Sequence, residues 1–200
     1  MKPKYAMAVL AAAICASGTA SVDAAGMGGY FGVGIGRARA PDLPSSACSL
    51  LPASYYACSV DDAQTSTKIF GGYQFNPYIA AEGTYSYFGN FEGRALSTAS
   101  VYPAKFRFEA SGLSFDAVGS LPITRNFSLL GRAGATIWSA IDIYDDYKSG
   151  VSADYGLGLE YDFVRPFGLR AEYVEYNGVG KSDIGKSNID VASLSAIFRF

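Results

Sequence analysis

The C-terminal stretch Asp190–Phe200 constrains the fold of this chain more strongly than any other part of the sequence. Its apolar face holds Ala192, Leu194, Ala196, Phe198 and Phe200, and its other face holds Ser193, Ser195, Ile197 and Arg199. An alternating run of about ten residues is long enough for a tilted strand to cross a bilayer. In a soluble protein this strand would be an aggregation-prone sheet edge, whereas closure of a barrel removes the edge and turns Leu194, Phe198 and Phe200 toward lipid. The stretch therefore predicts the closing strand of a transmembrane β-barrel.

The rest of the sequence favours strands over helices as the membrane-spanning elements. Hydrophobic residues make up 50% of the chain, yet no apolar run after the N-terminal segment approaches the roughly 20 residues of a membrane helix. A barrel strand exposes only every second side chain to lipid, so its sequence alternates. The alternating segments are Gly28–Arg39, Ser66–Phe75, Tyr78–Phe88, Lys105–Leu121, Phe127–Ser139, Val151–Phe163, Phe167–Tyr176 and Asp190–Phe200. We therefore expect an all-β fold, an eight-stranded antiparallel transmembrane β-barrel.

Short and long connections alternate between these segments. Short turns are expected at Pro77, Pro122 and Pro166. The longer loops are Pro41–Thr65, Gly89–Pro103, Asp142–Gly150 and Asn177–Asn188. Outer-membrane barrels have short periplasmic turns and long extracellular loops, so we expect an outer-membrane protein of a Gram-negative bacterium with both termini in the periplasm.

A soluble eight-stranded barrel is the main alternative, and it would carry its apolar residues inside. Charged residues argue against it, because they share the face opposite to the aromatic and aliphatic side chains. They are Glu82, Arg132, Glu160, Arg170 and Glu172. A soluble barrel with this pattern would expose a belt of Phe, Tyr and Leu around its whole circumference. The charges are therefore expected to point into the lumen of a membrane barrel.

One predicted strand, Lys105–Leu121, changes parity along its length. In its lower half Phe115 is expected to face outward and Asp116 inward, whereas Phe106 and Phe108 in the upper half lie on the other parity. A β-bulge would explain the change, and so would emergence of the strand above the membrane. The sequence leaves both explanations open.

Residues 1–24 have the features of a signal peptide, which leaves 25–200 as the barrel domain. Lys2 and Lys4 form a basic region, and the short apolar run Met7–Ala16 follows it. Small residues then lead to a cleavage site that ends at Ala24 or Ala25. Cys15 follows the large Ile14, where lipid attachment requires a small side chain, so we do not expect a lipoprotein.

Two cysteines, Cys48 and Cys58, remain after cleavage, both in the first long loop. An even pair in an exported chain predicts a disulfide bond, because the compartment is oxidising. Two free thiols are the alternative. A bridge would make the loop rigid.

Several motifs carry a resemblance to a known family. They are Phe70-Gly71-Gly72-Tyr73-Gln74-Phe75-Asn76-Pro77-Tyr78, Glu82, Leu121-Pro122-Ile123-Thr124, Gly131-Arg132-Ala133-Gly134, Trp138, Glu160-Tyr161 and Leu169-Arg170-Ala171-Glu172-Tyr173. Together they resemble the transmembrane domain of the outer-membrane protein A family over essentially the whole mature chain. The best-known members continue into a peptidoglycan-binding domain, which has no counterpart in this sequence. We therefore expect no anchoring of the cell wall.

The inward charges are the candidate site, and two interpretations of them are open. In the first, they form a salt-bridge plug that holds the barrel in shape, since an isolated charge is costly away from water. In the second, Arg170 exchanges acidic partners and opens a narrow path for small ions or solutes. The resemblance matches Glu82 and Arg170 to a lumenal ion pair of the family and Glu160 to a second carboxylate. The family's lumenal lysine has no counterpart near Asp116–Val118, and a gate predicts that Arg170→Ala raises bilayer conductance.

Catalysis is not expected, although some small outer-membrane barrels are enzymes. The sequence contains no histidine, so the Ser-His and Asp-His arrangements of barrel hydrolases cannot be formed. We expect no cofactor and no metal, because the chain has no His and its two mature cysteines are predicted to be bridged. The net charge of −2 and the lack of a basic stripe argue against nucleic acid.

The loops are the second candidate surface. They carry Asp61-Asp62, Asp142, Tyr144, Asp145-Asp146, Tyr147 and the segment Lys181–Lys186. One interpretation is solvated loops beside lipopolysaccharide, and the other is an adhesin or host-interaction surface. Aromatic anchors at the periplasmic interface are expected at Tyr30, Tyr78, Tyr161, Phe163, Phe167 and Phe200. We further expect a monomer that engages the barrel-assembly machinery through the strand ending in Phe200.

Overall fold

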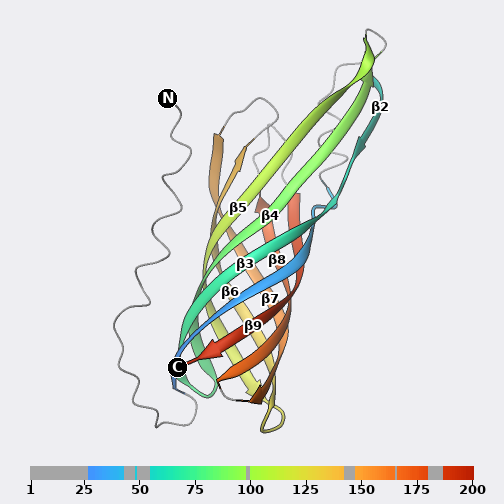
Figure 1. Ribbon diagram of the computed structural model, residues 1–200. Helices are drawn as coiled ribbons and strands as arrows, with labels where there is room; N and C mark the ends of the chain where they lie inside the picture. Colours follow the sequence, from blue (N-terminus) through green and yellow to red (C-terminus); the bar gives the residue numbers. More distant parts are fainter. Residues whose placement is uncertain are drawn as a thin grey trace, which may run out of the picture.

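The structure is a computed structural model that describes residues 27–42, 48, 55–97, 100–141, 147–164, 166–179 and 187–200. The predicted signal peptide and the loop segments 142–146 and 181–186 lie outside the described residues. Across the described residues the chain forms nine strands in one antiparallel sheet (Figure 1). The strands are β1 Gly28–Arg39, β2 Tyr55–Val60, β3 Ala63–Asn76, β4 Ile79–Ser97, β5 Ser100–Pro122, β6 Phe127–Ile141, β7 Tyr147–Val164, β8 Phe167–Val179 and β9 Ser187–Arg199. Among these residues no helix is long and apolar enough to cross a membrane.

Eight of the strands close into a barrel, which confirms the predicted fold. Consecutive barrel strands pair in order from β3 to β9, with β4 hydrogen-bonded to β5, and β1 lies between β3 and β9. The closing pair runs from Tyr30 opposite Arg199 to Arg39 opposite Asp190. Because β9 pairs on both sides, the C-terminal stretch has no free edge.

Alternation along each strand separates an apolar outer surface from a polar interior. Every barrel strand turns large apolar side chains outward. Examples are Val33, Ile69, Tyr85, Phe115, Ile137, Leu157, Tyr173 and Leu194, one from each strand in chain order, all between 40% and 68% exposed. A continuous apolar belt of this kind is unfavourable in water and is matched by the hydrocarbon of a bilayer.

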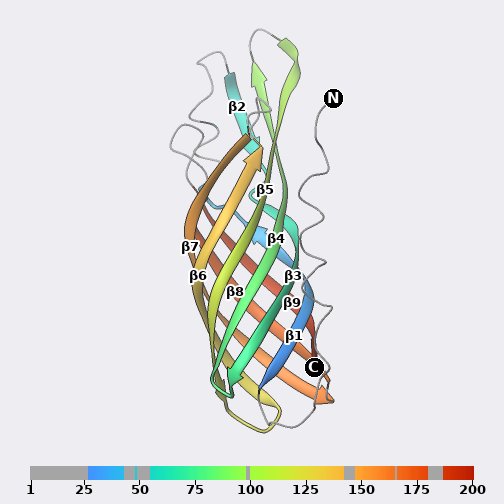
Figure 2. The same cartoon turned by 90° about the vertical axis from the view of Figure 1, so that its left-hand side faces the viewer.

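Short turns gather at one end of the barrel, together with the C-terminus (Figure 2). In the β3–β4 turn the side chain of Asn76 accepts hydrogen bonds from the backbone N–H groups of Tyr78 and Ile79, at 2.8 and 2.9 Å. This local bond explains why an Asn-Pro pair produces a tight turn. The terminal residue is held as well, because the Phe200 N–H donates to the Gly29 carbonyl at 2.9 Å.

At the other end β4 and β5 continue beyond the barrel as a long hairpin, and β2 pairs with the outer part of β4 (Figures 1 and 2). The predicted loop Gly89–Pro103 is therefore wrong, since β4 extends to Ser97 and β5 begins at Ser100. The predicted loop Pro41–Thr65 likewise contains β2 and the start of β3. β2 and the outer parts of β4 and β5 lie beyond the barrel, so the rule that one face meets lipid does not shape their sequence, whereas the start of β3 still pairs with β1.

A β-bulge lies where the hairpin leaves the barrel. The register of β4 against β5 shifts between Tyr87 and Gly89, and Gly89 has a φ of 98°. Below the bulge the even-numbered residues of β4 are buried, and above it Phe91 and Ala95 are buried instead. A bulge thus explains the parity change of β4. The parity change predicted from the sequence was on β5, in the segment Lys105–Leu121, and the side chains of Phe106 and Phe108 lie outside the described ones.

Candidate functional site

The five predicted lumenal charges all lie inside the barrel and are buried. Glu82 belongs to β4, Arg132 to β6, Glu160 to β7, and Arg170 and Glu172 to β8. Their exposed fractions range from 2% to 7%. Because alternate residues of every strand point inward, these charges from four strands meet inside the barrel, and together they are here called the charge network.

Arg132 lies at the centre of the charge network. Its Nη1 donates to Glu82 Oε1 at 3.2 Å and to Glu172 Oε1 at 3.4 Å. Its Nη2 donates to Thr84 Oγ1 at 3.3 Å and pairs with Asp116. A buried guanidinium is stable only with such partners, and the planar group reaches several carboxylates at once.

Arg170 connects the network to a lower level of the lumen. Its Nε donates to Glu160 at 2.9 Å, and its Nη1 donates to Glu82 Oε2 at 2.6 Å. Glu172 lies 3.9 Å from the same Nη1. Arg170 therefore has three acidic neighbours and already contacts the partners among which a gate would require it to exchange.

A cation that the sequence interpretation missed, Lys68 on β3, completes the network. It pairs with Glu172 and lies 5.3 Å from the ring centre of Phe70. The sequence has no lysine near Asp116, and in the structure a lysine from another strand, β3, enters the lumen instead. The inward face of β3 holds Ser66, Lys68 and Phe70, each two residues from the next. This alternation is the sequence signal that could have placed Lys68 in the lumen.

Tyr30 is a second residue whose position differs from the prediction. It was expected to anchor the barrel at the periplasmic interface, but it is only 4% exposed and lies in the lumen. Its hydroxyl donates to Glu82 Oε2 at 2.9 Å, and Arg170 lies 5.3 Å from its ring centre. The reason is parity, because Tyr30 shares the inward face of β1 with Gly32 and Gly34. The other predicted anchors, Tyr78, Tyr161, Phe163, Phe167 and Phe200, are exposed near the end with the short turns.

Apolar layers lie on both sides of the charge network. The lower layer consists of Tyr30, Phe70, Ala80, Val118, Leu130 and Ile197. The upper layer consists of Ala38, Ala40, Phe88, Phe91, Ala110, Trp138, Ala140, Val174, Tyr176, Val179, Ile189 and Val191. In the upper layer the rings of Phe88 and Tyr176 pack edge to face with centres 4.8 Å apart. The lumen is thus filled by apolar, charged and apolar side chains in sequence.

Little free volume remains beside the lower part of the network. A cavity of about 20 Å³ lies between Tyr30, Leu130, Glu160 and Arg170. That volume holds about one water molecule. Below it Arg199 pairs with Glu160 and Asp162, so charged groups reach the rim at the end with the short turns.

A second polar group lies just above the charge network. Ser114 and Thr136 hydroxyl oxygens are 2.7 Å apart, and Thr136 Oγ1 donates to Asp154 Oδ2 at 2.5 Å. One carboxylate oxygen of Asp154 and one of Asp116 have no hydrogen-bond partner among the described residues. Within the described part of the chain, no group of three or more Cys, Asp or Glu side chains is arranged to hold a metal ion.

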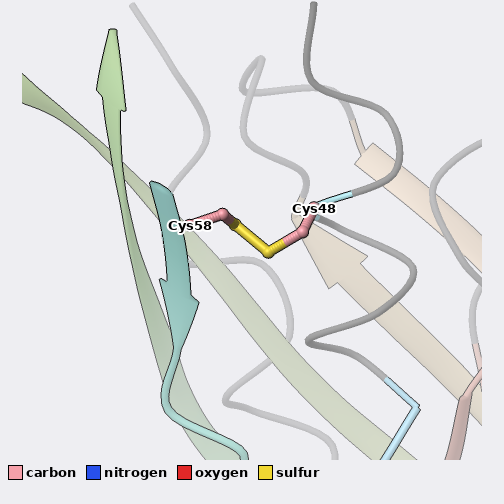
Figure 3. The surroundings of a disulfide bond; sticks show 2 residues. All are labelled: Cys48 and Cys58. Atoms are coloured by element: carbon pink, nitrogen blue, oxygen red, sulfur yellow. A yellow bond between two sulfur atoms is a disulfide. The ribbon is translucent and has the colours of Figure 1, made fainter. Parts of the chain in front are cut away.

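The predicted disulfide between Cys48 and Cys58 is present (Figure 3). Its Cα atoms are 5.8 Å apart, and Cys58 belongs to β2, which pairs with β4. The bond therefore ties Cys48 to the strand that pairs with the projecting hairpin. Asp61 and Asp62, just after β2, are exposed, whereas Asp142, Tyr144, Asp145, Asp146 and Lys181–Lys186 lie outside the described residues.

The closing strand turns its apolar face toward the outside of the barrel. Leu194 and Phe200 are 55% and 54% exposed on the outer surface. Phe198 is partly covered, because its ring lies 5.4 Å from those of Phe31 and Phe167. These aromatic contacts join β9 to both of its neighbours at the end where the barrel closes.

Comparison with known proteins identifies similar sequences and folds. A family model described as the OmpA-like transmembrane domain matches residues 26–200. Outer membrane protein A of Shigella flexneri is 28% identical over 149 residues, covering 68% of this chain and 40% of that protein. The same protein of Klebsiella pneumoniae is 29% identical over 151 residues, covering 68% and 41%. This chain therefore spans about two fifths of the length of these relatives.

Solved structures support the same architecture. The N-terminal β-barrel domain of Pseudomonas aeruginosa OprF superposes with a TM-score of 0.55 at 16% identity, covering 88% of this chain and 99% of that one. Neisserial surface protein A superposes with a TM-score of 0.60 at 13% identity, covering 86% and 97%. At these identities the similarity concerns the fold.

Proposed function

The chain belongs to the family of OmpA-like transmembrane domains, outer-membrane β-barrels, and from this we propose that it is a structural barrel whose lumen is closed at rest. One observation carries the proposal, namely that apolar side chains fill the lumen on both sides of the charge network. Water and ions would have to pass both apolar layers and separate the ion pairs between them.

A narrow, gated pore is part of this proposal, with two barriers in series. The first is the charge network, in which Arg170 must leave Glu82 or Glu160 to widen the path. The second is the upper apolar layer, where the contact between Phe88 and Tyr176 must open. Hydrophobic constrictions close channels by excluding water, so the upper layer blocks ions even when the ion pairs separate.

A flux assay tests the closed lumen. Purified barrel is reconstituted into liposomes that contain potassium and a potassium-sensitive dye. The rate at which potassium is released is compared with the rate for liposomes without protein. We expect equal rates for both, because buried apolar side chains of the described residues fill the upper layer. Faster release from liposomes that contain the wild-type barrel would contradict the proposal.

The orientation and partners follow from the same arrangement. We propose that the end with the short turns and the C-terminus faces the periplasm and that the projecting hairpin faces the cell exterior. The outer belt would contact outer-membrane lipid and lipopolysaccharide, and the strand ending in Phe200 would engage the barrel-assembly machinery. The family consists of structural barrels rather than enzymes, and we propose that this chain, a monomer, also lacks catalytic activity.

Surface binding is the second candidate function, and the projecting sheet favours it. β2, β4 and β5 form a three-stranded extension beyond the barrel, and a disulfide ties it to Cys48. A rigid extension loses little conformational entropy on binding, which suits an adhesin.

A truncated hairpin tests this second function. Asn90 lies opposite Glu109 in the β4–β5 pair, so residues 91–108 can be replaced by an Asn-Gly turn. Cells that express the full chain should adhere to an epithelial monolayer, and cells that express the truncated barrel should lose this adhesion. Equal adhesion at equal surface amounts would contradict a binding role for the extension.

A further inference from the structure

Two carboxylates meet above a glycine inside the barrel. Asp116 on β5 and Asp154 on β7 lie in register with Gly134 on the strand between them. Gly134 has no side chain to separate them, and a Cβ added there would collide with Asp116 Oδ1. Asp116 and Asp154 therefore flank Gly134 on the inward face, with no side chain on the strand between them.

Neither carboxylate is fully compensated by the residues around it. Arg132 and Asp116 form an ion pair through Oδ2 of Asp116, and the Oδ1 atom of Asp116 has no partner among the described residues. Asp154 is 2% exposed and receives the Thr136 hydroxyl at 2.5 Å, but none of the described cationic side chains pairs with it. A buried carboxylate without a counter-ion is strongly unfavourable.

The buried charges of the lumen also leave an excess of negative charge. The described buried cations are Lys68, Arg132 and Arg170, and the described buried carboxylates are Glu82, Asp116, Asp154, Glu160 and Glu172. Three positive charges therefore face five negative ones. Glu82, Glu160 and Glu172 are each paired with at least one cation, and Asp116 has only a share of Arg132, which also pairs with Glu82 and Glu172. Asp154 is thus the buried carboxylate that no described cation pairs with, and the negative excess lies on its side of the network.

We propose that Asp116, Asp154, Thr136 and Ser114 bind one hard divalent cation inside the lumen. The groups that converge there are carboxylate and hydroxyl oxygens, which such ions prefer. A Ca²⁺-like ion suits them best, because Ca²⁺ accepts irregular geometry and completes its shell with water, whereas Mg²⁺ requires an octahedron. Its two positive charges would balance the excess in the lumen, and its place between β5, β6 and β7 would join three barrel strands.

The sole tryptophan of the chain provides a direct readout. Trp138 follows Thr136 by two residues on the inward face of β6, so their Cα atoms are about 7 Å apart. Tb³⁺ replaces Ca²⁺ at oxygen sites and emits light when a nearby tryptophan is excited. The barrel is refolded in detergent with Tb³⁺ present, so that the ion need not enter through the closed ends.

The wild type should give Tb³⁺ luminescence that saturates and that Ca²⁺ displaces. Asp154→Asn should weaken binding at least tenfold, and Thr136→Val, which keeps the shape of the side chain, should weaken it less. Asp62→Asn is the control, because it removes the same charge at an exposed position. Folding of each variant is checked by the shift between unboiled and boiled samples on a gel.

Two results would overturn the proposal. An absence of sensitised luminescence from the folded wild type would mean that the two carboxylates share a proton instead. Equal signals from the wild type and the folded Asp154→Asn variant would mean that the ion binds elsewhere. The readout does not require conduction, so it is independent of the outcome of the flux assay.

Discussion

Tyr30 donates a hydrogen bond of 2.9 Å to Glu82, and this contact joins the lower apolar layer to the charge network. We predict that Tyr30→Phe lowers the free energy of unfolding by about 1.5–3 kcal/mol, the usual contribution of a hydrogen bond to a charged group. Urea unfolding of the barrel in lipid vesicles measures the change. Tyr78→Phe is the matched control, because Tyr78 is 59% exposed in a turn. Equal stability of the two variants would mean that the hydroxyl of Tyr30 contributes nothing.

Adjacent glycines on β3 should respond differently to the same substitution. A Cβ at Gly72 would lie 2.5 Å from the ring of Tyr30 and 2.6 Å from the Ala81 carbonyl oxygen, whereas at Gly71 the nearest atom is 3.7 Å away. We predict that Gly72→Ala costs about 1–3 kcal/mol through overpacking and that Gly71→Ala is nearly neutral. Unfolding in urea compares the two. A larger loss for Gly71→Ala would contradict the inward position of Gly72.

Reduction of the disulfide should loosen the extension and leave the barrel folded. The bond between Cys48 and Cys58 closes a loop with a sequence separation of 10, and such bonds are typically worth about 2–4 kcal/mol. We predict faster hydrogen exchange at Tyr55–Val60 in Cys48→Ser/Cys58→Ser, with unchanged exchange in β8. Reductant should reproduce this effect in the wild type and add nothing in the variant. Unchanged exchange in β2 would show that pairing with β4 is sufficient.

Much of the fold could be predicted from the sequence because the bilayer imposes a simple rule on barrel strands. Phe115 and Leu157 must face lipid and Arg170 must not, so a period of two fixes both the strands and their inward faces. The same rule predicted that the five charges of the network face the interior of the barrel. It fails for β2 and the outer parts of β4 and β5, which lie beyond the barrel, because there no face of the strand is required to meet lipid.

Lys68 and Tyr30 were not predicted as members of the charge network, because the pattern along one strand does not show which residues of other strands it will contact. Lys68 and Tyr30 have inward parity, but their importance comes from partners on other strands, Glu172 and Glu82. The upper apolar layer was also unexpected, since Phe88 and Tyr176 meet only after the barrel closes. Partner identity depends on register between distant strands, which no single segment encodes.

The central claim is that two barriers in series close the lumen, and single-channel recording tests it most directly. The set comprises wild type, Arg170→Ala, Phe88→Ala and the double variant, each confirmed as folded by its gel shift. Phe115→Ala is the control, because Phe115 is 60% exposed on the outer surface. We predict silence from the wild type and from each single variant, and discrete steps from the double variant. Steady openings of the wild type, or of Arg170→Ala alone, would contradict the account.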